Sequence, residues 1–179
     1  LLRADLVDRT FRERSGEEAL IEMKSMRSMV RSSLQEVRRI IYNLRPMALD
    51  DLGLVPTIRK YLADLEEYHK MTITLSEHGS VDRLASKYEV ALFRLIQESV
   101  QNAIKHAVAE RIHVNIRNER NQVSVSIRDD GVGFDLAKKK EKSFGIIGMR
   151  ERVEMLDGSI TINSKIGGGT TVYVKIPLK

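Results

Sequence analysis

A heptad pattern of apolar residues in the first quarter of the chain limits its fold most strongly. Between residues 17 and 45 apolar side chains recur at alternating three- and four-residue steps, and Arg27 fills one place in the series. The apolar members are Leu20, Met23, Val30, Leu34, Val37, Ile41 and Leu44. This spacing predicts a helix whose apolar seam packs against other helices. With the short charged segment from Leu2 to Arg14, it predicts a helical hairpin that pairs with a second copy as a homodimeric four-helix bundle.

The seam ends at Pro46, which cannot continue a helix. The sequence Asp50-Asp51-Leu52-Gly53 is predicted to be a loop, and a domain boundary is placed at Gly53. Residues 54–70 are predicted to form a bridging helix, with Pro56 near its start. The expected domains are therefore residues 1–53 and residues 54–179.

Beyond Met71 the periodicity changes to that of strands. Alternating apolar residues predict strands around 71–76, 112–116, 123–127, 160–162 and 172–176, and broader apolar faces predict helices at 87–107 and 146–156. The order β-α-β-β-loop-α-β-β predicts an α+β sandwich in which helices cover one face of a sheet.

The composition excludes several classes of protein. There is no cysteine, so disulfide scaffolds, thiol catalysis and cysteine-ligated metals are excluded. There is no apolar run of about 18 residues and no signal peptide, and we expect a soluble, cytoplasmic piece of a longer protein that contacts no membrane. The net charge of +5 is compatible with nucleic acid, an anionic membrane or a phosphate-bearing ligand, but no motif that reads nucleic acid is present.

A polar stripe on the helix at 87–107 is the first candidate site. Glu98, Asn102, Lys105 and His106 follow α-helical spacing and would share one face. An asparagine oxygen suits Mg²⁺, and Lys and His suit phosphates. A simple solvated helix face remains the alternative.

Glycines mark three further candidate segments, and eight of the eleven glycines follow residue 130. Asp129-Asp130-Gly131-Val132-Gly133 follows a strand, where a carboxylate could accept the amino group of adenine. Gly145-Ile-Ile-Gly148-Met149 opens a helix and could bind an anion, with Lys138, Lys139, Lys140 and Lys142 as a lid. Gly167-Gly168-Gly169-Thr170 joins the last two strands. Taken singly, each segment could also be an ordinary turn.

In chain order these segments resemble the N, G1, G2 and G3 boxes of the GHKL ATPases. The matching patterns are Glu98-x-x-x-Asn102, Asp129-x-Gly131-x-Gly133, Gly145-x-x-Gly148-Met149 and Gly167-x-Gly169-Thr170. Sensor histidine kinases, gyrase B, Hsp90 and MutL belong to that family. The resemblance spans about residues 71–179 and implies a Bergerat-type ATP-binding α/β sandwich with a mixed sheet.

The segments 36–46, 52–56 and 144–152 are similar to the NarL-partnered histidine kinases, which extends the resemblance over the whole chain. It implies a homodimer through the helical hairpin, ATP and Mg²⁺ as cofactors, and transfer of the γ-phosphate to a histidine and then to an aspartate of a response regulator. That partner would be a NarL-type, DNA-binding regulator, so the chain itself would contact no nucleic acid.

The same resemblance implies roles for single residues. Asp129 would bind the adenine amino group, and Thr170 would support it through water. Asn102 would hold Mg²⁺, and Glu98 and Asn102 would be the catalytic residues. The remaining residues named for the nucleotide site are Lys105 and His106 on the phosphate side, Gly131, Gly133, Gly145 and Gly148 around the lid, and Met149, Gly167 and Gly169 within the boxes.

The chain departs from the family pattern in one respect. In the family the histidine that accepts the phosphoryl group lies in a His-Asp dipeptide on the first hairpin helix, and this chain has no such dipeptide. Its histidines are His69, His78, His106 and His113, and none lies in the first helix. We attribute this to truncation a few turns downstream of the acceptor histidine, and we expect this chain to bind ATP without phosphorylating itself on the usual residue. The alternatives are a nucleotide-dependent dimerisation module without transfer, and a GHKL serine kinase that acts as an anti-sigma factor.

Overall fold

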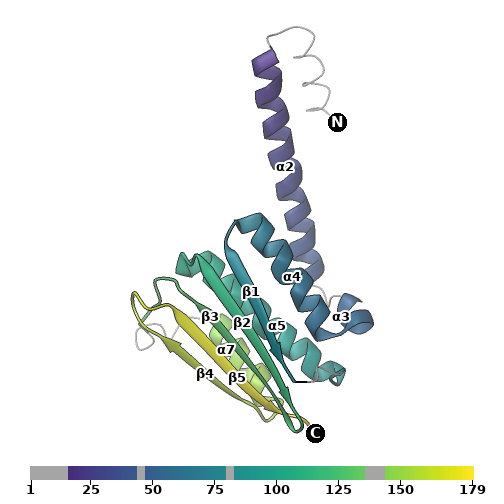
Figure 1. Ribbon diagram of the computed structural model, residues 1–179, viewed down its shortest axis with the longest axis vertical. Helices are drawn as coiled ribbons and strands as arrows, with labels where there is room; N and C mark the ends of the chain where they lie inside the picture. The colour runs from purple at the N-terminus through teal and green to yellow at the C-terminus, as the bar shows by residue number, and fades with distance from the viewer. Residues whose placement is uncertain (1–15, 44–46, 80–82, 136–143) are drawn as a thin grey trace. The chain divides into compact units, whose positions relative to one another are not determined.

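The computed structural model describes residues 16–43, 47–79, 83–135 and 144–179 (Figure 1). The chain divides into two compact units, residues 1–46 and 47–179, so the division comes seven residues before Gly53. Each unit is described by itself.

The first unit contains helix α2, Gly16–Asn43. Its seam residues Leu20, Met23, Val30, Leu34 and Val37 are 48–54% exposed in the single chain. The α2 helix thus presents an apolar stripe along most of its length, as the heptad spacing predicts. The expected first hairpin helix, residues 2–14, lies outside the described residues.

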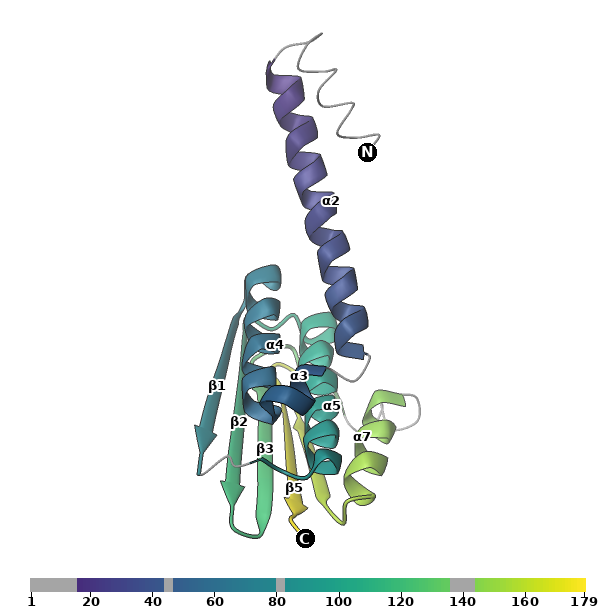
Figure 2. The same cartoon turned by 90° about the vertical axis from the view of Figure 1, so that its right-hand side faces the viewer.

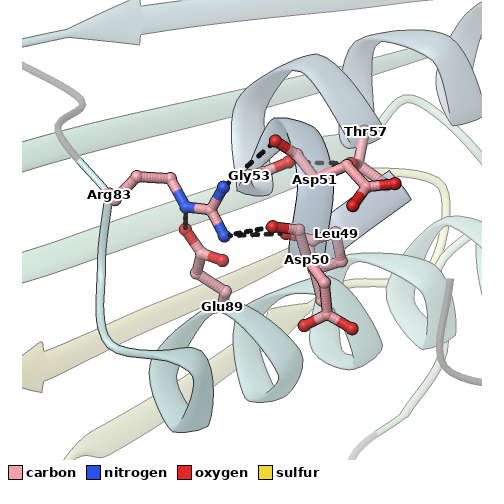
Figure 3. A network of polar contacts seen from close by, with 7 residues as sticks. All are labelled: Leu49, Asp50, Asp51, Gly53, Thr57, Arg83 and Glu89. Carbon is pink, nitrogen blue, oxygen red and sulfur yellow. Dashed lines mark hydrogen bonds and ion pairs between the residues drawn. The ribbon is translucent and has the colours of Figure 1, made fainter. Parts of the chain in front are cut away.

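The second unit begins with helix α3, Met47–Leu52, and helix α4, Leu54–His69. The loop predicted for residues 50–53 is therefore wrong, since its first three residues are helical and only Gly53 separates the two helices. Leu49 is 1% exposed and anchors α3 in the core. Arg83, more than thirty residues away, donates hydrogen bonds to the carbonyl oxygens at the end of α3 (Figure 3).

A five-stranded mixed sheet follows in the order β1-β2-β3-β5-β4. Its strands are β1 Thr72–His78, β2 Arg111–Glu119, β3 Gln122–Asp129, β4 Ser159–Ser164 and β5 Thr170–Pro177. The pairing of β1 with β2 is parallel, and the other three pairings are antiparallel. Alternate side chains of β2, β3 and β5 are buried, which is the pattern that a sheet with one covered face requires.

Helices α4, α5 (Ser86–Asn102) and α7 (Phe144–Glu154) cover that face (Figure 2). The core between the two layers contains Ile58, Phe93, Ile96, Val114 and Val174, each at most 1% exposed. The predicted α+β sandwich with a mixed sheet is confirmed. Within the described ranges, no helix combines the length and the apolar content needed to cross a membrane.

Candidate functional site

A pocket of about 90 Å³ lies between α5, α7 and the strands β3, β4 and β5. Six residues predicted for the nucleotide site line it, and these are Asn102, His106, Asp129, Gly133, Met149 and Thr170. Its other walls are mainly apolar and come from Ala103, Ala107, Ile127, Phe134, Ile146, Ile162 and Val172, with Ser99 beside them. A small number of polar groups on apolar walls is typical of a ligand site.

Asp129 is the buried carboxylate of this pocket. It ends β3 and is 8% exposed. Its Oδ1 accepts hydrogen bonds from the backbone N–H of Gly131 at 3.0 Å and of Thr170 at 3.2 Å. Burial is the main cause that raises the pKa of Asp129 above its ordinary value. Because the hydrogen bonds from Gly131 and Thr170 both use Oδ1, Oδ2 is the oxygen that can accept one from a ligand.

Two glycines let the loops around Asp129 approach each other closely. Gly133 has φ +59°, and a Cβ there would lie 2.0 Å from the carbonyl oxygen of Lys165. Gly169 has φ +73°, and a Cβ there would lie 2.2 Å from the carbonyl oxygen of Asp129. A side chain at either position would be both strained and in collision. The backbone beside the carboxylate therefore depends on these glycines.

The polar stripe on α5 is only partly an α-helical face. Asn102 Nδ2 donates to Glu98 Oε1 at 3.2 Å, one α-helical turn away. The next five residues, Ala103–Ala107, form a π-helix (η1) instead of the predicted continuation of the α-helix. Both Lys105 and His106 are exposed, but only His106 lines the pocket.

The π-helix is held at its end by the segment after β3. Val108 has φ +51°, which ends the helix, and the carbonyl oxygen of Ala107 accepts the N–H of Val132 at 2.8 Å. A Cβ on Gly131 would lie 2.3 Å from that same carbonyl oxygen. The Gly131 segment is thus packed directly against the helix that carries Asn102 and His106.

The first turn of α7 meets the same stripe. A Cβ on Gly145 would lie 2.2 Å from Glu98 Oε1 and 3.7 Å from Asn102 Nδ2. Met149 is 2% exposed, and its sulfur accepts a hydrogen bond from the Ser99 hydroxyl at 3.5 Å. Gly148 lies further along α7 and does not line the pocket. The predicted lysine lid, Lys138–140 and Lys142, lies outside the described residues.

Ser164 is a site residue that sequence reasoning missed. It ends β4, and its hydroxyl donates to the carbonyl oxygen of Gly169 at 3.2 Å and lies 2.9 Å from the Thr170 hydroxyl. It also accepts the N–H of Phe134 at 2.9 Å, which joins the Gly133 and Gly169 loops. Gly167 adds a second link, because its N–H donates to the carbonyl oxygen of Val132 at 2.7 Å. No local motif marks a serine at the end of a strand.

The residues present fit a magnesium ion that a ligand brings with it. The described residues contain no group of three His, Cys, Asp or Glu side chains that could hold a metal. Mg²⁺ usually keeps several waters and binds through one or two protein oxygens together with substrate phosphates. The side-chain oxygen of Asn102, with Glu98 beside it, matches such a minimal site.

Two family models match the chain. The model described as "Histidine kinase-, DNA gyrase B-, and HSP90-like ATPase" matches residues 87–179, and a model described as "Histidine kinase" matches residues 1–49. The first match contains every residue of the pocket, and the second ends within α3.

Two curated relatives match along almost the whole chain. Each is named "Signal transduction histidine-protein kinase/phosphatase DegS". The Brevibacillus brevis protein is 48% identical over 178 residues, which are 99% of this chain and 46% of the relative. The Bacillus subtilis (strain 168) protein is 52% identical over 184 residues, which are 99% of this chain and 48% of the relative. The chain spans about half the length of these relatives.

Solved structures show the same fold. The histidine kinase domain of the Erythrobacter litoralis EL346 blue-light activated histidine kinase has a TM-score of 0.62 at 21% identity, with 99% of this chain and 95% of that chain covered. Full-length ShkA in complex with AMPPNP has a TM-score of 0.59 at 15% identity, with 70% of this chain and 29% of that chain covered.

Proposed function

Because the chain belongs to the family of histidine kinase-, DNA gyrase B- and HSP90-like ATPases, and within it to the histidine kinases, we propose that its pocket binds Mg-ATP for phosphoryl transfer to a histidine. The observation that carries this proposal is Asp129, a buried carboxylate with one oxygen bound to backbone N–H groups and the other available. An oxygen in this state accepts the exocyclic amino group of adenine and repels the carbonyl oxygen of guanine.

The purine would lie between apolar walls. Ile127, Ile162 and Val172 come from the sheet, and Ile146 and Met149 come from α7. Such walls exclude water around the base, which strengthens the hydrogen bond to Asp129. Thr170, held by Ser164, would support the base from the strand side.

The phosphates would extend toward Asn102, Glu98 and His106. Asn102 would hold Mg²⁺, which neutralises phosphate charge when bound, and His106 and the exposed Lys105 would face the phosphate oxygens. Transfer breaks the bond between the γ-phosphorus and the bridging oxygen of ATP and forms a P–N bond to the acceptor imidazole, and ADP leaves. Glu98 would take the proton that the imidazole releases. The contribution of the protein is mainly positioning and charge neutralisation.

The helical segment would supply the dimer. The apolar stripe of α2 is about half exposed in one chain, and a second copy would cover it in a four-helix bundle. The phosphoryl group would then pass to an aspartate of a response regulator of the NarL type, in the cytoplasm. DNA contact would belong to that regulator.

A nucleotide-dependent dimerisation module without productive transfer is the second candidate, and the apolar stripe of α2, about half exposed in the single chain, favours it. To separate the two, a fragment that carries the acceptor histidine is added to the chain with Mg-ATP. The kinase proposal predicts acid-labile phosphate on the fragment, and the Asn102→Ala variant should abolish it. Tight ATP binding without any such phosphate would contradict the kinase proposal and support the second candidate.

A further inference from the structure

Arg83 joins the connector helix α3 to the beginning of α5. Its guanidinium donates to three consecutive carbonyl oxygens, those of Leu49 at 3.4 Å, Asp50 at 2.6 Å and Asp51 at 3.3 Å (Figure 3). A helix leaves its last carbonyl groups without partners, and a helix of six residues is too short to be stable alone. The carbonyl oxygen of Leu49 also accepts the N–H of Gly53 at 3.2 Å, so Arg83 matters most for those of Asp50 and Asp51.

The other side of the guanidinium faces Glu89 in the first turn of α5. Arg83 Nε lies 3.5 Å from Glu89 Oε1, and the Glu89 side chain is 4% exposed whereas that of Arg83 is 55% exposed. A buried carboxylate needs a counterion, and Arg83 is the ion-pair partner that the described residues provide. The pair therefore fixes the direction of the Arg83 side chain as well as neutralising Glu89.

Gly53 leaves room for this arrangement. It has φ +82°, and a Cβ there would lie 3.1 Å from Arg83 Cδ and 3.5 Å from Glu89 Oε1. Thr57 closes the turn, because its hydroxyl donates to the carbonyl oxygen of Gly53 at 2.7 Å. Five residues from three segments thus form one polar cluster, which we call the Arg83 clip: Asp50, Asp51, Gly53, Arg83 and Glu89.

The Arg83 clip joins a helix that follows the first unit to a helix that carries residues of the proposed site. Helix α3 directly follows the first unit along the chain, and the histidine kinase match ends within it at residue 49. Helix α5 is one continuous helix that carries Glu98 and Asn102 near its other end. The clip therefore connects the attachment point of the first unit to the helix that carries the proposed catalytic residues.

We propose that Arg83 is a positioning residue for phosphoryl transfer, which holds the attachment point of the helical unit fixed with respect to Glu98 and Asn102. This inference rests on the proposed kinase function. Without the clip α3 unravels, and its six residues change from a helix of about 9 Å to a tether of up to about 20 Å. A longer, less oriented tether lowers the effective concentration of the acceptor at the γ-phosphate.

Hydrogen exchange on the 179-residue chain tests the clip without reference to catalysis. The double variant Arg83→Met/Glu89→Gln removes both charges, so that no buried carboxylate is left unpaired. We expect exchange in residues 47–53 to rise at least about tenfold, while residues 90–102 keep their protection. The control Arg59→Met removes another arginine ion pair, 2.6 Å to Glu77, and should change neither segment. Unchanged protection of residues 47–53 in the double variant would overturn the clip.

Kinetics then test the positioning role. In a chain extended by the N-terminal segment with the acceptor histidine, the double variant should lose about tenfold or more in kcat for self-phosphorylation, with the KM for ATP unchanged. Transfer to a separately added acceptor fragment should keep its wild-type rate. Arg83→Lys keeps the charge but cannot bind three carbonyl oxygens together, so its kcat for self-phosphorylation should lie between that of the double variant and that of the wild type.

The outcomes of this second experiment are distinct. Equal loss of tethered and untethered transfer, or no loss of either, would refute the positioning role. Failure of the wild-type chain to transfer at all would refute the proposed function instead, while the exchange result on α3 would stand.

Discussion

Replacement of Asp129 by Asn is expected to weaken ATP binding, and the structure fixes how the new amide must lie. The backbone N–H groups of Gly131 and Thr170 both point at Oδ1. Only the carbonyl oxygen of an asparagine can accept from them, so its NH₂ group takes the place of Oδ2. A donor then faces the amino group of adenine, which is also a donor.

The size of the loss in ATP affinity follows from the hydrogen bond between Asp129 and the adenine amino group, which the variant cannot form. A hydrogen bond to a charged group contributes about 1.5–3 kcal/mol, so ATP affinity should fall about 10- to 150-fold. The same NH₂ group can donate to the carbonyl oxygen of guanine, so GTP should lose little or gain. The fold should remain, because both backbone N–H groups keep an acceptor and a raised pKa shows that the charge is costly there.

Isothermal titration with ATP and GTP measures both effects. The matched control is Asp130→Asn, since Asp130 is the neighbouring carboxylate but faces away and pairs with Arg111 at 2.9 Å. This control should leave nucleotide affinity within about twofold of wild type. An unchanged ATP dissociation constant in Asp129→Asn, or equal losses for ATP and GTP, would show that Asp129 does not contact the base.

Three further results are expected. Gly167→Ala should lower the unfolding free energy by only about 1 kcal/mol, because its φ of +75° is strained for alanine but no atom lies within 4 Å of the new Cβ. Gly169→Ala should cost several times more, because its Cβ would lie 2.2 Å from the Asp129 carbonyl oxygen. Equal losses for the two variants in denaturant titrations would contradict this. Hydrogen bonds from Arg111, first from its side chain, lower the pKa of Asp130 to about 2. The stabilisation from this carboxylate should therefore be present above pH 4 and be lost as the pH falls toward 2. A wild-type acid-unfolding curve identical to that of the Asp130→Asn variant would refute this stabilisation. Removal of Mg²⁺ with EDTA should weaken the binding of ATP much more than that of adenosine. Titrations that show equal effects on the two ligands would show that no metal ion contributes to ATP binding.

The sheet and its helices could be predicted from the sequence because their signal is local. Ile112, Val114 and Ile116 alternate with polar residues, and each is buried as that pattern requires. The nucleotide boxes could be located because their glycines stand close together within short segments of the sequence. Six of the predicted site residues line one pocket, although they come from segments up to 68 residues apart, from Asn102 to Thr170.

The errors and omissions arise from contacts between distant segments. Residues 50–52 look like a turn by composition, but Arg83 caps them as a helix. The π-helix before Val108 depends on a hydrogen bond from Val132, which lies 25 residues beyond its acceptor Ala107. Ser164 acts only through the loops that it joins. A local sequence pattern cannot predict these three contacts, because the segments meet only once the sheet and its helices have packed.

The adenine specificity of the proposed nucleotide site is tested most directly by thermal melting of the wild-type chain with Mg-ATP and with Mg-GTP. A ligand at about 100 times its dissociation constant adds about 2.7 kcal/mol of stability, which for a chain of this size raises the Tm by about 5–10 °C. Such a rise is expected with Mg-ATP, and a much smaller one with Mg-GTP at the same concentration. Equal shifts with both nucleotides, or no shift with Mg-ATP, would contradict it.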